Sequence, residues 1–169
     1  MNHRVRQLAA FAAVATIGIA AACGDDDEPT GPNVTRTTFT AQLNGANERP
    51  DPVTTTGTGT ATLVKFNNDS ITFTIQVASI DSVILSHIHA GDAETAGPIL
   101  FAFPETNPPT SFTTLATLHT GTITPTSTFS GSFTWDSLLT RLSAGTAYVN
   151  VHTRMNTGGE IRAQLVQQP

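Results

Sequence analysis

The feature that most constrains the fold of this chain is a two-residue alternation of apolar and polar side chains. It is clearest where Ile71, Phe73, Ile75 and Val77 occupy every second position. The residues between and before them are Ser70, Thr72, Thr74 and Gln76. Because successive side chains of a β-strand point to opposite faces, this pattern predicts a strand with one face in a core.

Similar runs recur along the chain and are separated by turn-forming residues. The other strand-like segments are Thr37–Leu43, Thr58–Phe66, Val83–Ala90, Ile99–Phe103, Leu115–Ile123, Thr126–Thr134, Thr146–Thr153 and Glu160–Val166. The turn signals are Asn44-Gly45, Asn67-Asn68-Asp69, Pro108-Pro109 and Thr157-Gly158-Gly159. About nine short strands with frequent turns predict an all-β fold, an antiparallel Greek-key-like β-sandwich or a barrel.

One segment interrupts the strand pattern and predicts a short helix. Leu138, Leu139 and Leu142 have helical spacing. Asp136 is expected to cap the start of this helix, and Gly145 to end it.

Residues 1–22 have the features of a secretory signal peptide. Arg4 and Arg6 give a positively charged start, and the uncharged apolar run Leu8–Ala22 follows. The alternative is an uncleaved membrane anchor, but the run is shorter than the ~20 residues that span a bilayer. We therefore expect export, with the folded part outside the cytoplasm.

Cys23, the only cysteine, follows Ala20-Ala21-Ala22, and this junction resembles a bacterial lipoprotein processing site. In such sites a small-residue triplet precedes a cysteine that becomes acylated. Ala20 stands where leucine is more common, and cleavage by an ordinary signal peptidase with a free thiol at Cys23 is the alternative. Acylation predicts stable anchoring to a membrane of the cell envelope. With one cysteine the domain has no internal disulfide, so its stability depends on its core.

Residues 23–36 are expected to be a disordered acidic tether, and residues 37–167 the single folded domain. The tether contains Asp25-Asp26-Asp27-Glu28 followed by proline and glycine, a composition that cannot bury a core. Without Arg4 and Arg6, six Lys and Arg face thirteen Asp and Glu, a net charge of −7. The sequence shows no basic patch, which argues against nucleic acid as a partner.

Three of the five histidines form the best candidate site. His87 and His89 share one face of their predicted strand, and Tyr148, Asn150 and His152 share one face of another. With the aliphatic faces in the core, these side chains are expected to project outward. If the two strands are neighbours, the three imidazoles meet in one patch.

A His-x-His pair on one strand and a third histidine on the next is a ligand set suited to copper or zinc. Glu160 or Asp92 is expected to orient a ring, and Arg162 to lie beside the patch and attract an anion. The alternative is a structural hydrogen-bond network around residues 91–97. For Glu160 and Arg162 the alternative is a same-face pair that follows a tight turn at Gly158-Gly159.

The sequence offers no clear sign of catalysis. No Ser-His-Asp or Cys-His arrangement, paired carboxylates or phosphate-binding glycine loop is discernible. His119 lies apart from the other histidines, among threonines, and is expected at the surface. We therefore do not expect an enzyme.

Several separated motifs, in order, resemble the CHRD domain, a module named after chordin and found in bacterial secreted and lipid-anchored proteins. They are Leu43-Asn44-Gly45-Ala46-Asn47-Glu48-Arg49-Pro50, Gly57 and Gly59 with Ala61, His87-Ile88-His89-Ala90-Gly91, Gly97-Pro98-Ile99, Tyr148-Val149-Asn150-Val151-His152-Thr153 and Gly159-Glu160-Ile161-Arg162-Ala163-Gln164-Leu165. The resemblance runs from about Phe39 to Leu165. Ala163 stands where the family usually has glycine, which is expected to alter only local packing. Bacterial members generally have no assigned reaction, so the resemblance implies little about activity.

A fainter resemblance is to copper-zinc superoxide dismutase, which is also a Greek-key β-sandwich. It implies His87, His89 and His152 as copper ligands and Arg162 as a substrate-guiding arginine. The chain departs from that enzyme because only His119 lies where the enzyme has a bridging histidine and a zinc cluster. The cysteines of its disulfide are also missing.

The first functional hypothesis is a lipid-anchored, non-catalytic binding or structural module of the cell envelope, with an unknown protein or glycan ligand. The alternative is a transition-metal protein that holds copper or zinc at His87, His89 and His152, for redox chemistry or metal sequestration. Residues expected around such a site are Tyr148, Asn150, Glu160 and Arg162.

Overall fold

The computed structural model describes residues 34–169. The predicted signal peptide, Cys23 and most of the predicted tether lie outside the described residues. Asn33–Pro169 forms one compact unit. Within residues 34–169, no helix has the length and apolar character needed to cross a membrane.

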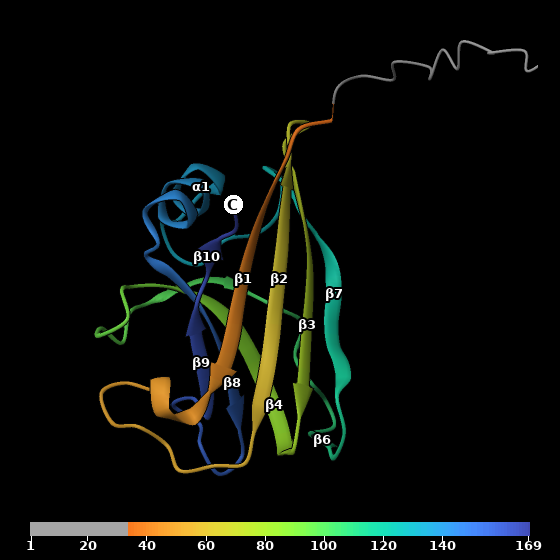
Figure 1. Ribbon diagram of the computed structural model, residues 1–169, viewed down its shortest axis with the longest axis vertical. Coiled ribbons are helices and arrows are strands. Elements are labelled where there is room, and N and C mark those ends of the chain that lie inside the picture. The colour runs from red at the N-terminus through yellow and green to blue at the C-terminus, as the bar shows by residue number, and fades with distance from the viewer. Residues whose placement is uncertain (1–33) are drawn as a thin grey trace, which may run out of the picture. The chain divides into compact units, whose positions relative to one another are not determined.

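Residues 34–169 form a curled antiparallel sheet of ten strands, which confirms the predicted all-β, sandwich-like class. The strands are β1 (Arg36–Asn44), β2 (Thr58–Phe66), β3 (Ser70–Ala78), β4 (Ile80–Ala90), β5 (Ile99–Ala102), β6 (Thr110–Phe112), β7 (Ala116–Ile123), β8 (Ala147–Thr153), β9 (Ile161–Gln164) and β10 (Val166–Gln167). Their order is β5-β4-β8-β9-β1-β2-β3-β7, with β6 paired to β4 and β10 paired to β1. In Figure 1, β1, β2, β3 and β7 run side by side as one layer of the sheet.

The two-residue alternation of β3 builds one wall of the core. Ile71, Ile75 and Val77 have no exposed surface, while the polar residues between them are exposed or half-buried. Asp69 has φ 57° in the short turn that joins β2 to β3, a left-handed conformation that aspartate tolerates. Within residues 34–169, the hydrophobic core is formed by residues between Phe39 and Leu165.

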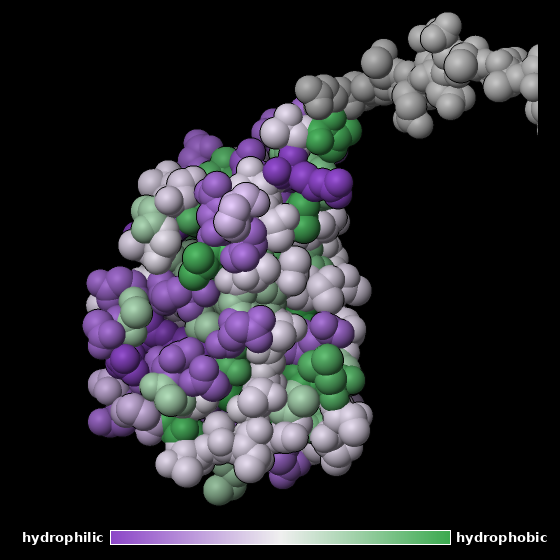
Figure 2. All heavy atoms as spheres, viewed as in Figure 1, coloured by the Kyte–Doolittle hydropathy of each residue, from purple (hydrophilic) through white to green (hydrophobic). Residues whose placement is uncertain are grey.

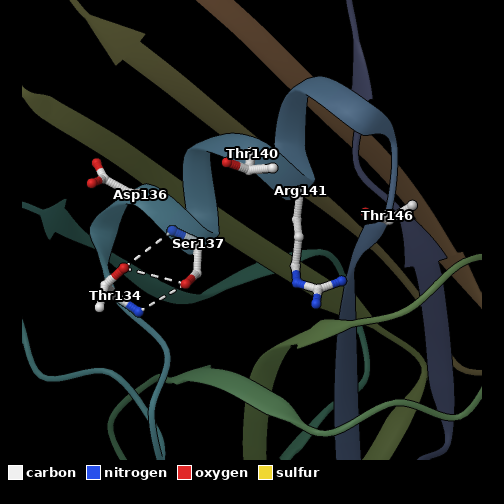
Figure 3. Close-up of a pocket in the computed structure, with 6 residues that line it drawn as sticks. All are labelled: Thr134, Asp136, Ser137, Thr140, Arg141 and Thr146. Carbon is white, nitrogen blue, oxygen red and sulfur yellow. Dashed lines mark hydrogen bonds between the residues drawn. The ribbon is translucent and has the colours of Figure 1, made fainter.

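The predicted helix is α1 (Trp135–Ala144), but its N-terminal cap is Thr134 rather than Asp136. The Thr134 hydroxyl accepts a hydrogen bond from the Ser137 backbone N–H, and the Ser137 hydroxyl accepts one from the Thr134 backbone N–H, as Figure 3 shows. Gly145, with φ 68°, ends the helix as predicted. The buried face of α1 consists of Trp135, Leu138 and Leu142.

The predicted strand Thr126–Thr134 is wrong, because this segment has no strand structure. The backbone N–H of Ser127 donates to the carbonyl of Thr124, and the Ser127 hydroxyl accepts from the Thr124 N–H. Such local side-chain bonds stabilise a turn in competition with a ladder. Phe129 instead packs against Phe101 with ring centroids 5.8 Å apart.

The predicted strand Glu160–Val166 is divided in two at Leu165. The first part, β9, pairs with β8, and the second part, β10, pairs with β1. Leu165 itself is fully buried, so this is the point where the chain moves from one neighbour to the other. The short strand β6 was not predicted, because it is too short to show a period.

Candidate functional site

The candidate site forms because β4 and β8 are neighbours in the sheet. Their antiparallel register places His87 opposite Asn150, His89 opposite Tyr148, and Leu85 opposite His152. The residues that alternate toward one face of each strand therefore meet. One ring nitrogen from each of His87, His89 and His152 lies within 4.8 Å of the others. We call these three residues the histidine cluster.

The cluster is buried, which corrects the prediction that its side chains project outward. His87, His89 and His152 are only 6%, 8% and 6% exposed. Every residue of β8 is buried, so both of its faces are covered. One face is covered by three connecting segments, which are the loop between β4 and β5, the loop after β8, and the segment after β1. The β4–β5 loop projects at the left of Figure 1, and hydrophilic side chains gather there in Figure 2.

Two backbone carbonyls fix the protonation of two of the rings. Nδ1 of His89 lies 2.9 Å from the carbonyl oxygen of Gly97, and Nδ1 of His152 lies 3.0 Å from that of Thr157. A carbonyl oxygen only accepts hydrogen bonds, so each Nδ1 carries a proton. In a neutral ring, Nε2 then holds a free lone pair.

The two Nε2 atoms differ in their contacts. Nε2 of His152 lies 3.0 Å from Nδ1 of His87, which must donate to it. Nε2 of His89 is buried and has no hydrogen-bond partner among residues 34–169. A buried acceptor without a partner costs about 1–3 kcal/mol, unless something binds it.

All three imidazoles are held neutral. Desolvation by burial, together with the neighbouring histidines, lowers the pKa of His87 to about 4. Burial also lowers the pKa of His89 to about 4, against the opposing effect of its bond to Gly97. The pKa of His152 is lowered for the same reason. Neutral imidazole is the form that a metal ion requires, so near pH 7 burial keeps the three rings in that form.

These lowered pKa values predict acid sensitivity that depends on the cluster. Unfolded histidines bind protons near pH 6.5 and the folded ones near pH 4, so stability is lost as the pH falls through this window. Between pH 7 and pH 4.5, we expect the unfolding free energy of the wild type to fall by about 3 kcal/mol more than that of a His87→Gln/His89→Gln variant. Urea titrations at both pH values measure this difference, and equal losses in the two proteins would contradict it.

Tyr148 and Arg162 lie next to the cluster, as predicted. The rings of Tyr148 and His89 are stacked, with centroids 5.0 Å apart and an interplanar angle of 9°. The guanidinium carbon of Arg162 lies 3.6 Å from the centroid of the Tyr148 ring, so Tyr148 contacts both His89 and Arg162. Arg162 is 1% exposed. Its attraction for an anion stays a prediction.

The prediction that Glu160 or Asp92 orients a ring does not match the contacts, because backbone carbonyls hold Nδ1 of both His89 and His152. Glu160 instead accepts hydrogen bonds from the side chains of Thr55, Thr153 and Asn156. It thereby joins the segment before β2 to β8 and to the loop that follows it. The hydrogen bonds of Glu160 therefore join segments of the fold, and the alternative of a same-face pair with Arg162 stays a prediction.

Asn150 contacts Glu48, a buried acid that was not predicted to belong to the site. Glu48 is 2% exposed, and Asn150 donates to its Oε2 over 3.3 Å. Oε1 of Glu48 and Oδ1 of Asn150 have no partner among residues 34–169. Burial raises the pKa of Glu48 to about 7, although Arg162 opposes the shift. The only available signal was its place in the motif 43–50.

The raised pKa of Glu48 predicts that Glu48→Gln stabilises the domain in alkali. The folded protein keeps the Glu48 proton up to about pH 7, while the unfolded chain releases it near pH 4.5, so wild-type stability falls as the pH rises through this range. A glutamine mimics the neutral acid. We expect the variant to be about 2 kcal/mol more stable at pH 8 and equal to the wild type at pH 4. Exposed Glu105→Gln serves as the control, and a stabilisation equal to that of the control would contradict the argument.

His119 lies outside the cluster. It was predicted to lie at the surface, but it is half-buried. Its ring stacks on Phe103 with centroids 5.8 Å apart. Burial lowers its pKa.

Comparison with known protein families assigns the chain. The model of the CHRD domain matches residues 39–165, which is most of the sequence and nearly all of the folded unit. The chain belongs to the CHRD family. The match contains the whole histidine cluster, together with Glu48, Tyr148 and Arg162. No curated protein and no solved structure gives a significant match to this CHRD protein. The likeness to copper-zinc superoxide dismutase stays a hypothesis.

Proposed function

We propose that this CHRD protein is a lipid-anchored, non-catalytic binding module of the bacterial cell envelope. We further propose that the ligand of the module is a transition-metal ion held by His87, His89 and His152. The anchor and the exported location rest on the sequence pattern around Cys23, and the ligand rests on the geometry of the histidine cluster.

The observation that carries the metal proposal is the fixed tautomer of two of the three rings. The carbonyls of Gly97 and Thr157 hold protons on Nδ1 of His89 and His152, which leaves Nε2 as the lone-pair nitrogen of each ring. A metal-binding histidine usually donates its second ring N–H to such a partner. With Nδ1 of His89 already held by Gly97, a bound cation would also satisfy its buried Nε2, which has no hydrogen-bond partner among residues 34–169.

The third ring, His87, has a different hydrogen-bond partner. Nδ1 of His87 donates to Nε2 of His152 across 3.0 Å. A cation that takes the place of this bridging proton would meet both nitrogens, provided that the His87 proton moves to Nε2 of the same ring. The hydrogen bond thus holds two ligand atoms near each other while the site is free.

The donor set selects the class of metal. Three imidazole nitrogens suit zinc and copper, whereas calcium and magnesium prefer carboxylate and carbonyl oxygens. Three protein ligands also leave one position open for a fourth ligand. If the bound metal is copper, the site could also perform redox chemistry, which is the alternative that the sequence suggests.

The metal proposal is tested by the metal content of untagged residues 33–169. The domain is incubated with zinc or copper, desalted, and measured by plasma mass spectrometry beside protein quantitation. We expect close to one equivalent of metal per chain. A folded domain that retains no metal would sink the metal proposal and leave the cluster as part of the scaffold.

The anchor is tested separately in the full-length protein. Cells that express the wild type and Cys23→Ser are labelled with a clickable palmitate analogue and then fractionated. We expect label and membrane association in the wild type only. Unlabelled wild-type protein would show that Cys23 is not acylated, without bearing on the metal site.

A further inference from the structure

Arg162 is a buried cation that metal binding does not directly require. It lies on β9 opposite Asn150 of β8 and is 1% exposed. Among residues 34–169, the only ion pair joins Arg49 to Glu94, so no carboxylate lies within ion-pair distance of Arg162. Burial of a cation without a close ion pair is costly, which indicates that its specific hydrogen bonds are needed.

The guanidinium of Arg162 holds the loop between β4 and β5. Its Nη2 donates to the carbonyl of Asp92 over 2.6 Å and to the carbonyl of Thr95 over 3.0 Å. Both carbonyls lie in residues 91–98, a segment without a strand or a helix. Hydrogen bonds from a charged donor are roughly twice as strong as neutral ones. Backbone hydrogen bonds hold the two ends of this loop, at Gly91 and Pro98, and Arg162 holds its middle at Asp92 and Thr95.

Gly97 lies near the end of the same loop, and its two backbone groups contact His89 and Tyr148. Its carbonyl accepts from Nδ1 of His89 over 2.9 Å, and its N–H donates to the Tyr148 hydroxyl over 2.9 Å. Tyr148 contacts both Arg162 and His89: Cζ of Arg162 lies 3.6 Å from the Tyr148 ring centroid, and the rings of His89 and Tyr148 are stacked. Two routes, one through the loop and one through the tyrosine ring, connect Arg162 to the same imidazole.

We propose that Arg162 is a positioning residue of the metal site: it holds the Gly97 carbonyl in place, and thereby keeps His89 with its proton on Nδ1 and its Nε2 lone pair directed into the cluster. This inference rests on the proposed metal-binding function. Lysine is a poor substitute, because an ammonium cannot offer a planar group that stacks on Tyr148 and also reaches two carbonyls.

The test reads the His89 tautomer directly by long-range ¹⁵N–¹H NMR of the metal-free domain, and zinc affinity by competition titration. The variants are Arg162→Met, which keeps the length of the side chain without a donor, and Arg162→Lys. The matched control is Arg49→Gln, because Arg49 contacts the same loop only through the exposed side chain of Glu94. Backbone amide spectra establish that each variant is folded.

In the wild type and in Arg49→Gln we expect a single Nδ1–H tautomer at His89. In Arg162→Met we expect a mixture of tautomers and a zinc affinity lower by about 10- to 100-fold, the loss typical when a partner of a metal ligand is removed. Arg162→Lys should lie between the two. A folded Arg162→Met with an unchanged tautomer and zinc affinity within twofold of wild type would overturn the inference. If Arg162→Met does not fold, Arg162→Lys decides, and wild-type values in that variant would overturn it.

The two proposals fail in different ways. A wild type that binds no zinc but shows the single tautomer, lost in Arg162→Met, would remove the metal function while leaving the role of Arg162 at His89. A wild type that binds zinc, with Arg162 variants that bind it equally, would remove only the role of Arg162.

Discussion

Replacing His89 with alanine is expected to lower the zinc affinity of the domain by about 100-fold or more. His89 supplies one of the three imidazoles of the cluster, and its Nε2 has no hydrogen-bond partner among the described residues, so its loss leaves two ligands. The removal of a partner that only orients a ligand already costs 10- to 100-fold, and removal of the ligand itself should cost at least as much. Isothermal titration with zinc in a weakly competing buffer measures the change.

His119→Ala is the matched control, because His119 is a half-buried histidine outside the cluster. We expect its zinc affinity to stay within twofold of the wild type. Equal affinities in His89→Ala and His119→Ala would show that zinc binds elsewhere on the chain. A fall in both variants would indicate a general effect on folding.

The second large effect is expected at Gly97. An added Cβ at this position would overlap the backbone carbonyl of Ala90, and neither strand β4 nor the loop can easily give way. We expect Gly97→Ala to lower the free energy of unfolding by about 3 kcal/mol, the upper part of the range for overpacking. Because the Gly97 carbonyl also holds Nδ1 of His89, the variant should bind zinc more weakly even where it is folded.

Gly158→Ala is the control for this substitution. A Cβ at Gly158 would meet no atom within 4 Å, and this glycine also lies in a loop that covers the cluster. Chemical denaturation of the two variants should therefore give a large loss for Gly97→Ala and almost none for Gly158→Ala. Equal stabilities would contradict the packing that the structure shows around Gly97.

The strands were predictable where each one has a core face and a polar face. The bounds of β2 and the apolar face of β3 agree with the periodicity, because burial of one face imposes a period of two. The strand predicted for Thr126–Thr134 was wrong, because serine and threonine are frequent both in strands and in local turns. The cap of α1 was misplaced by two residues, since a threonine and an aspartate are both good caps.

The ligands of the candidate site were also predictable, and their surroundings were not. His87 and His89 share a face through strand geometry alone, and His152 joins them through the pairing of β4 with β8. The burial of this patch depends on loops, whose paths leave no period in the sequence. The groups that hold Nδ1 of His89 and His152 are main-chain carbonyls, which any residue supplies. Glu48 was missed for a related reason, since its contact to Asn150 joins segments far apart in the chain.

The measurement that tests the central claim most directly is X-ray absorption spectroscopy of the zinc-loaded domain. The account predicts a first shell with three imidazole nitrogens at about 2.0–2.1 Å and one further light atom. The multiple-scattering pattern of imidazole rings should weaken in His89→Ala, if any zinc is retained. A shell dominated by oxygen atoms, without the imidazole pattern, would contradict the claim that His87, His89 and His152 form a metal site.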